Sequence, residues 1–331
     1  MLPIVAKLLR IDPQEVQVSR RGFFCARPSV RIRLEHIGKV FLQGYHAALA
    51  SRSATSLRRQ LEQAEYEYRG FAYEGAAMAL TVRDALTPGS PRLLQFINHA
   101  GKDHIYTLHV GAGWACARVP WLRRRLEKFI TNFDPVLRWL VVDGFGFHEG
   151  YFHHQTAIQS ATGLSEESVH VFYQGLGRSL WFVHGCDVKR MASAIDQYHP
   201  AFHSDAWSGV GLACGYAGGV TIAEIEQAAV LAARHRPALA QGAAFAAKAR
   251  LLAGNPVRHS ELACRMLCQL SAEDAAALCD ETLSKINIAS ANPYQQWRLL
   301  VQKLLSPLQS AMGREFRDPV ISPQVVQAKY N

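Results

Sequence analysis

The stretch Asp143-Gly-Phe-Gly-Phe-His-Glu-Gly-Tyr-Phe-His-His154 decides how the rest of the chain is interpreted. Its twelve residues include four aromatic residues, three histidines, two carboxylates and three glycines. If a helix is entered near Gly146, Glu149 and His153 share one of its faces, because residues four apart are neighbours on a helix surface. This composition indicates either an aromatic-lined polar pocket or a densely packed junction between helices.

Helical periodicity dominates the sequence on both sides of this stretch. Residues 30–50 place apolar side chains at a spacing near 3.6, and residues 56–86 continue the pattern up to a break rich in proline and glycine. A further helix is expected over 295–305. Strand-like alternation is scarce, and residues 139–142 are its best candidate. We therefore predict an all-α chain.

Internal repeats are marked by Gln-Gly or Glu-Gly pairs inside the expected helices, at residues 43–44, 74–75, 149–150, 174–175 and 241–242. A glycine in each pair lets neighbouring helices approach closely. The pairs and a later Gly-x-Ala-Cys segment keep nearly the same spacing in both halves of the chain. Two related units are therefore expected, with equivalent glycines at Gly44 and Gly150, Gly75 and Gly175, and Gly113 and Gly211.

This self-similarity predicts duplicated helical units stacked as a solenoid-like array, followed by a third, alanine-rich helical segment. The expected divisions are an N-terminal segment (1–29), helical unit 1 (30–120), helical unit 2 (121–219), a C-terminal helical segment (220–306) and a polar tail (307–331).

The composition is that of a globular protein, with 49% hydrophobic and 19% charged residues among 331, and it excludes disorder over most of the length. The formal net charge is +9, and the arginines cluster at 20–21, 27–33, 58–59 and 123–125. A basic balance favours an acidic partner. No recognisable nucleic-acid module accompanies these clusters, so we expect no nucleic acid among the partners.

Cysteine usage and hydropathy bear on the compartment. The seven cysteines are spread singly through apolar contexts, which predicts reduced and mostly buried thiols. The N-terminus lacks the apolar core of a signal peptide, and no run approaches the roughly 18 apolar residues that span a bilayer. We therefore expect a cytoplasmic protein without a transmembrane segment.

The opening stretch supports two interpretations of Glu149. A buried carboxylate near aromatic rings is readily tuned for general acid–base chemistry. Alternatively, Glu149 fills a repeat position also occupied by Gln43, Glu74 and Gln174, and only bridges helices. The nearby histidines offer metal-ligand types without the spacing of a known helical metal motif, so neither a metal nor another cofactor is expected. Arg178 could clamp an acidic group or pair with Asp143 or Glu149.

Four stretches resemble one bacterial family over nearly the whole chain: residues 106–121, 142–152, 174–181 and 207–219. These stretches are similar to the UnbL-type proteins, unassigned proteins that are encoded beside enediyne and related iterative polyketide synthases. The resemblance implies a role in antibiotic biosynthesis, within the secondary metabolism of a polyketide. It brings no catalytic residue with it.

The leading expectation is an enzyme that acts by proton transfer on a long unsaturated acyl or polyene intermediate. The expected catalytic residues are His148, Glu149, Asp143 and Arg178. The expected hydrophobic lining, suited to a polyene, is Phe145, Phe147, Tyr151, Phe152, Tyr173, Trp181 and Trp207. The expected partners are the synthase or its acidic acyl carrier protein. Two alternatives stay open: a non-catalytic helical-repeat scaffold for these partners, and an all-α cyclase of a polyene or isoprenoid chain.

Overall fold

The computed structural model describes residues 8–87, 89 and 91–315, with side chains described up to residue 306. Every regular element in these ranges is a helix, which confirms the all-α prediction. The α- and π-helices are α2 (Val18–Arg21), α3 (Pro28–Ala50), α4 (Ala54–Leu61), α5 (Arg69–Leu86), α6 (Arg92–His99), α7 (Ile105–Arg118), α8 (Pro120–Arg123), α9 (Leu126–Ile130), α10 (Trp139–Phe152), α11 (Glu166–Val183), α12 (Val188–Ile195), α13 (His203–Ala217), α14 (Ile222–Ala232), α15 (Arg236–Leu252), α16 (Arg258–Ala263), η6 (Cys264–Cys268), α17 (Ala272–Leu283) and α18 (Pro293–Glu315). The 3-10 turns are η1 (Pro13–Val16), η2 (Lys102–His104), η3 (Ala157–Ala161), η4 (Pro200–Phe202) and η5 (Ala233–His235).

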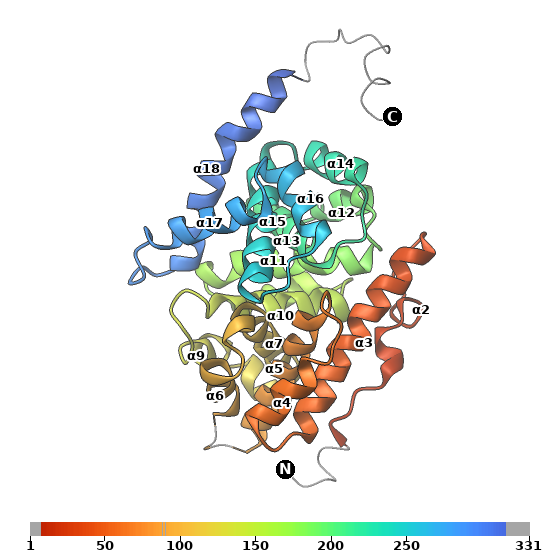
Figure 1. Cartoon of the computed structure of the whole chain (residues 1–331), viewed down its shortest axis with the longest axis vertical. Coiled ribbons are helices and arrows are strands. Elements are labelled where there is room, and N and C mark those ends of the chain that lie inside the picture. The colour runs from red at the N-terminus through yellow and green to blue at the C-terminus, as the bar shows by residue number, and fades with distance from the viewer. Residues whose placement is uncertain (1–7, 88, 90, 316–331) are drawn as a thin grey trace.

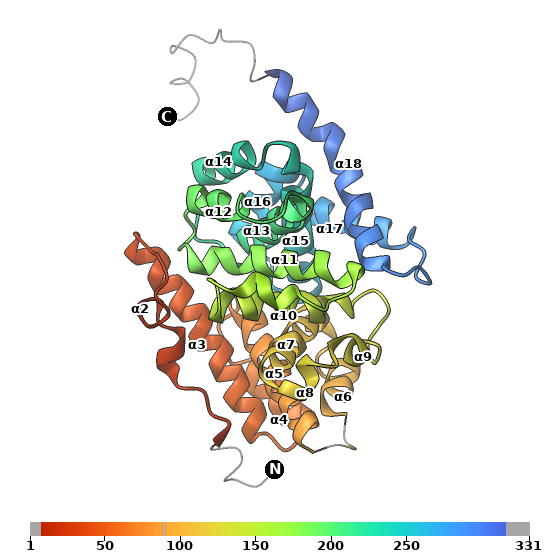
Figure 2. The ribbon, with the colours of Figure 1, turned by 180° about the vertical axis from the view of Figure 1, so that it is seen from behind.

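The longer helices form a row in which each packs against the next, in the order α3, α5, α7, α10, α11, α13 and α15. Helices α10 and α11 cross the middle of the molecule, with α3, α5 and α7 on one side and α13 and α15 on the other (Figure 1). The short helices lie around this row, and α18 leads away from it towards the C-terminus (Figures 1 and 2).

Several helices begin where the sequence supplies a cap. Pro28 opens α3 at a position that needs no backbone N–H. The Ser165 side chain accepts a hydrogen bond from the backbone N–H of Ser168 at the start of α11, where two glutamates follow in the first turn. Thr221 and Glu224 form a complete capping box on α14.

Glycines set the close spacing of the row. A Cβ added to Gly75 on α5 would collide with the carbonyl oxygen of Phe41 on α3, and one added to Gly175 on α11 would collide with that of Asp143 on α10. The close approach that each glycine permits offsets its helix-propensity cost of about 1 kcal/mol.

These contacts test the expected equivalences between the two halves. The contacts of Gly75 and Gly175 correspond, and so do those of Gly113 and Gly211, which meet carbonyl oxygens of α10 and α15 respectively. Gly44 meets the carbonyl oxygen of Ala72. Its counterpart is Gly146, which meets that of Phe172, whereas Gly150 abuts the Ser179 side chain.

The expected pairing of Gly44 with Gly150 is therefore wrong by one helical turn. Helix α10 begins at Trp139 and not near Gly146, so its contact point with α11 lies earlier. The solenoid-like stacking of whole units and their boundaries remain predictions.

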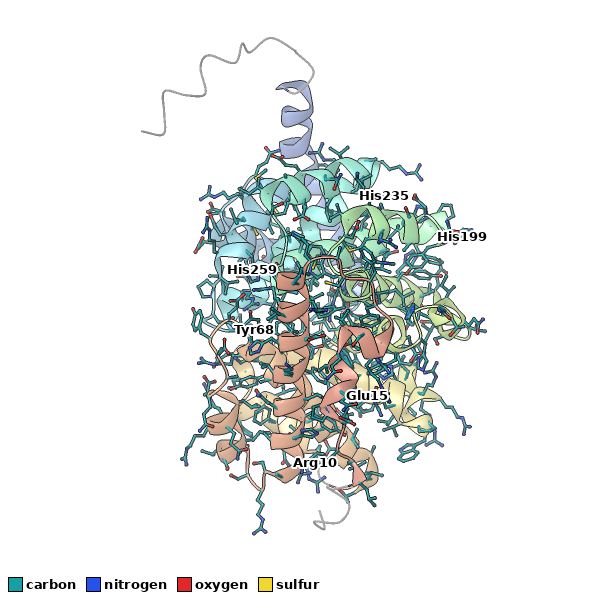
Figure 3. The ribbon with its side chains drawn as sticks, turned by 90° about the vertical axis from the view of Figure 1, so that its right-hand side faces the viewer. Arg10, Glu15, Tyr68, His199, His235 and His259 are labelled. Carbon is teal, nitrogen blue, oxygen red and sulfur yellow. The ribbon has the colours of Figure 1, made fainter. Side chains whose placement is uncertain are left out.

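The row curves so that its first helix, α3, lies beside the end of α13 and beside α16. The Arg33 guanidinium donates to the Ala217 carbonyl oxygen at 2.6 Å and to the Tyr68 hydroxyl at 3.2 Å, and it lies 3.5 Å from His259 Nδ1. Figure 3 shows Tyr68 and His259 on this side of the molecule, with Glu15 on the segment that precedes α3. Residues near the start and the end of the row thus enclose a common interior.

Three expected elements differ in the structure. The pattern over 56–86 is split into α4 and α5, because the backbone between them serves tertiary contacts: the Glu67 carbonyl accepts from Arg250 and the Tyr66 carbonyl from Asn255. Residues 139–142 are the first turn of α10. Helix α18 continues to Glu315, past the expected end at 305, while residues 316–331 of the expected tail lie outside the described residues.

Two further expectations concern cysteines and membranes. Six of the seven cysteines are buried as expected, and Cys25 is partly buried. Over the described residues, no helix combines the length and the apolar character that a membrane crossing requires.

Candidate functional site

A cavity lies inside the curve of the helix row. Its volume is about 110 Å³, well above the roughly 10–15 Å³ that holds a single water molecule. The lining reaches from Ile11 and Val16, before α3, to Tyr294 and Trp297 on α18. Aromatic rings contribute much of the wall: Phe41, Phe71, Trp114, Phe147, Tyr151, Phe152, Phe182, Tyr216 and Phe245.

A buried glutamate and a buried arginine interrupt this apolar wall. Glu74 on α5 is 5% exposed and Arg178 on α11 is 7% exposed, and both line the cavity. Arg178 Nη2 lies 3.8 Å from Glu74 Oε1. Arg178 Nη1 donates to Asp143 Oδ1 at 2.6 Å, and its guanidinium lies 4.8 Å from the ring centre of Phe147. One guanidinium therefore faces two buried carboxyl groups.

The two carboxyl groups differ in their hydrogen bonds. Burial raises the pKa of Glu74 from 4.5 to about 7, although Arg178 and a hydrogen bond from Trp114 both favour the charged form. Trp114 Nε1 donates to Glu74 Oε1 at 3.0 Å. Burial also raises the pKa of Asp143, opposed by Arg178 and by a 2.7 Å hydrogen bond from Gln174 Nε2. Near neutral pH, Glu74 populates both its protonated and ionised forms.

Four polar residues that precede helix-contact glycines form one buried network. Gln174 donates to Asp143, and Ser208 Oγ donates to Gln241 Oε1 at 2.8 Å and to Gln174 Oε1 at 3.4 Å. Each of these residues is fully buried, and each stands immediately before a glycine. The close approach at the glycine brings the preceding polar side chains within hydrogen-bonding reach. This explains the Gln-Gly pairs at 174–175 and 241–242 in packing terms, whereas Gln43 of the pair 43–44 is exposed.

Glu149 belongs to a second cluster, at the end of α10. Its carboxylate accepts two hydrogen bonds of 2.9 Å from Arg123 and another from Ser160. His148 Nδ1 and His153 Nδ1 lie 3.2 and 3.7 Å from Glu149 Oε1. Burial opposes ionisation of Glu149, but the hydrogen bonds from His148, Arg123 and Ser160 together lower its pKa to about 2. Burial lowers the pKa of His148 to about 4, so its ring is neutral at pH 7.

The same cluster offers three ligand types for a metal ion. One ligand atom from each of His148, Glu149 and His153 lies within 4.8 Å of the others. However, both oxygens of Glu149 already accept hydrogen bonds from Arg123, and the guanidinium supplies the positive charge that balances the carboxylate. The arrangement is therefore chemically complete as a salt bridge between the buried Glu149 and the half-buried Arg123.

The structure divides the four expected catalytic residues into two pairs: Asp143 contacts Arg178, and His148 contacts Glu149. Of these residues, Arg178 alone lines the cavity. Their catalytic roles remain predictions.

The expected aromatic lining divides in the same way. Phe147, Tyr151 and Phe152 line the cavity. Those placed elsewhere are Phe145, which stacks under Arg123; Tyr173, which stacks on Phe202; Trp181, which donates to the Gly218 carbonyl; and Trp207, which is buried in α13.

Among the wall residues for which the sequence indicated no chemical role are Glu74, Trp114 and Tyr216. A signal for Glu74 was present. At the corresponding position the second unit has Gln174, so the first unit carries an acid where its counterpart carries a neutral amide of the same shape. An ionisable group at a buried repeat position is a functional candidate.

Searches of curated proteins and of solved structures found no match to this chain. One family model does match, and it covers residues 3–305. The match spans the helix row, the cavity wall and both charged clusters. The chain therefore belongs to the family described as "Protein of unknown function (DUF1702)".

Proposed function

We propose that this chain is an enzyme of secondary-metabolite biosynthesis that binds a long unsaturated acyl or polyene intermediate in the central cavity and transfers a proton through Glu74. The observation that carries the proposal is an aromatic-lined cavity with a buried carboxyl group in its wall. The resemblance to proteins encoded beside iterative polyketide synthases supports an enediyne-type or other polyketide as the product.

The cavity lining supports an elongated, apolar ligand. Wall residues come from the segment before α3, from several helices of the row, and from α18. A chain of conjugated carbons has flat apolar faces, and aromatic rings are well suited to contact them. Burying such a chain contributes about 25 cal/mol per Å² of apolar surface removed from water.

The position and titration of Glu74 support proton transfer. Its carboxyl group lines the cavity and is buried away from bulk water. With a pKa of about 7 it can donate or accept a proton at neutral pH, and positioned groups of this kind contribute about 10² to 10⁴-fold to a rate. Arg178 and Trp114 hold the carboxyl group in place.

Filling the cavity tests the proposed binding. Ala213 on α13 lines the cavity, so Ala213→Leu should abolish binding of a linear conjugated tetraene hydrocarbon. Ala228→Leu is the matched control, because Ala228 is equally buried but lies on α14 outside the lining. Binding can be followed by quenching of tryptophan fluorescence, since Trp114 and Trp297 line the cavity. Equal binding by both variants and wild type would refute the assigned site.

Replacing Glu74 tests the proposed chemistry separately. Glu74→Gln keeps an acceptor for Trp114 but removes the titrating group. We expect it to retain tetraene binding while lowering the yield of the metabolite about 10²-fold or more. Full yield from Glu74→Gln would leave a binding protein without proton transfer at this residue.

Exposed arginines favour an acidic acyl carrier protein or synthase domain as partner. Arg118 is exposed and also contributes to the cavity lining, and Arg124 and Arg125 are exposed after α8. A partner that docks there could deliver a tethered acyl chain to the cavity. A cytoplasmic location completes the proposal, in keeping with seven unpaired cysteines among the described residues.

A further inference from the structure

Tyr216 is a residue of the cavity wall whose hydroxyl group is unpaired among the described residues. The residue lies on α13, is 7% exposed and lines the cavity. Its hydroxyl oxygen is buried and has no hydrogen-bond partner among the described residues. A buried hydroxyl without a partner costs about 1–3 kcal/mol, so an acceptor oxygen brought within reach of it would be stabilised.

The hydroxyl lies close to Glu74. A Cβ added to Gly70 on α5 would lie only 1.9 Å from the Tyr216 hydroxyl oxygen, so this oxygen packs directly against α5 at Gly70. Burial raises the pKa of the Tyr216 hydroxyl, and the charge of Glu74 also acts on it and raises the pKa further. Residues 70 and 74 are one turn apart on the same face of α5, where Cβ atoms are about 5–6 Å apart. Tyr216 and Glu74 therefore present their polar groups to the same part of the interior.

One carboxyl oxygen of Glu74 is free to hydrogen-bond a ligand. Oε1 accepts from Trp114 and faces Arg178, while Oε2 makes no hydrogen bond with the described residues. In the protonated form this second oxygen is a donor. Two donors that face the same part of the interior can share one acceptor oxygen, because each O–H···O bond spans about 2.7–2.8 Å and a carbonyl oxygen has two lone pairs.

The charges of Arg178 and Asp143 favour an uncharged hydrogen-bond acceptor on the ligand. The positive charge of Arg178 is already met by Asp143, at 2.6 Å. A ligand carboxylate at this place would add a further negative charge beside Asp143 and Glu74. A carbonyl oxygen accepts two hydrogen bonds without adding charge.

We propose that the cavity recognises the carbonyl oxygen of a conjugated, uncharged polyene ketone or ester, through hydrogen bonds from the Tyr216 hydroxyl and the protonated carboxyl group of Glu74. This inference deepens the proposed function and rests on it. The pairing of a tyrosine hydroxyl with a protonated carboxyl group is an effective way to polarise a carbonyl group in an apolar site. Polarisation of a conjugated carbonyl would favour proton transfer along the attached chain.

Two probes of equal length test the inference: a linear conjugated tetraene with a terminal methyl ketone, and the tetraene hydrocarbon. Wild-type protein should bind the ketone more tightly and shift its absorption maximum to longer wavelength, because hydrogen bonding stabilises its polar excited state. Tyr216→Phe should weaken ketone binding about tenfold and reduce the absorption shift. Binding of the hydrocarbon should not change.

The matched control is Tyr173→Phe, because Tyr173 is also buried but lies outside the cavity lining. If Tyr216→Phe retains the ketone affinity and the absorption shift, carbonyl recognition by Tyr216 is refuted while polyene binding stands. If wild-type protein binds neither probe, the proposed function fails and this inference fails with it.

A measurement on wild-type protein provides a check that does not depend on the folding of a variant. Ketone affinity should fall as the pH rises above 7, because Glu74 loses the proton that it donates. The ionisable groups that face Glu74 are Arg178 on α11, Asp143 on α10 and Tyr216 on α13. Hydrocarbon affinity should stay constant, and an equal pH response of both probes would contradict the inference.

Discussion

Glu74 and Glu149 are both buried glutamates, but their replacement by glutamine should change stability in opposite directions. Glu74 lies in an apolar wall, where burial raises its pKa to about 7. Glu149 accepts hydrogen bonds from Arg123, Ser160 and His148, which lower its pKa to about 2. Both substitutions preserve the side-chain shape and remove the charge. The contrast therefore isolates the electrostatic environment of each carboxyl group.

The expected magnitudes follow from these pKa values. An unfolded glutamate has a pKa near 4.5, and one pKa unit corresponds to about 1.4 kcal/mol. Because the folded-state pKa of Glu74 is raised, its favourable contribution is present at low pH and is lost as the pH rises from about 4.5 to 7. Glu74→Gln should therefore gain about 2 kcal/mol relative to wild type between pH 5.5 and pH 8.

For Glu149 the sign is reversed. Its folded-state pKa is lowered, so its contribution is present above pH 4.5 and is lost as the pH falls towards 2. Glu149→Gln should destabilise the protein by about 3 kcal/mol throughout pH 5.5 to 8. The difference from wild type should stay nearly constant over that range.

The assay is urea-induced unfolding of wild type and both variants at several pH values, followed by circular dichroism to obtain the free energy of unfolding. The control is Glu226→Gln, because Glu226 on α14 is exposed. If Glu74→Gln destabilises at pH 8 as much as Glu149→Gln, Glu74 is an ionised salt-bridge partner of Arg178. The cavity would then hold no group that gains and loses a proton near pH 7.

Two further predictions concern packing and partners. Gly175→Ala should destabilise the protein by several kcal/mol, because the new Cβ would collide with the Asp143 carbonyl oxygen and force α10 and α11 apart. Thermal unfolding would measure the loss, with Ser193→Ala, at an exposed position on α12, as the control. Equal melting temperatures of the two variants would contradict the close packing. Binding of an acidic acyl carrier protein should weaken steeply between 50 and 500 mM salt, since exposed charges are screened beyond about 8 Å at physiological ionic strength. Arg124→Glu should reproduce this loss of binding at low salt. Binding that does not depend on salt would exclude docking at Arg118, Arg124 and Arg125.

The sequence predicted the helical class and the role of several glycines, because both follow from local spacing. Apolar residues at 3.6-residue intervals define helix faces whatever their partners are. The pairs at Gly75 and Gly175 revealed a shared packing mode before any contact was known. The break between Leu61 and Arg69 could not be predicted in this way, since it depends on hydrogen bonds to Arg250 and Asn255, far along the chain.

The site was harder to predict than the fold. Glu149 stood out because histidines and aromatic residues surround it in the sequence, yet in the structure its carboxylate is occupied by Arg123 and Ser160. Glu74 has no unusual neighbours in sequence. Its environment is made by Trp114 and Arg178, which reach it from other helices. No local pattern carries that information.

A crystal structure of the protein with the tetraene methyl ketone bound would test the proposed binding site most directly. We expect the polyene chain inside the cavity, beside Phe147 and Trp114, with its carbonyl oxygen within hydrogen-bonding distance of Tyr216 and Glu74. Density for the ketone only on the outer surface, or a cavity that stays filled by rearranged side chains, would contradict it.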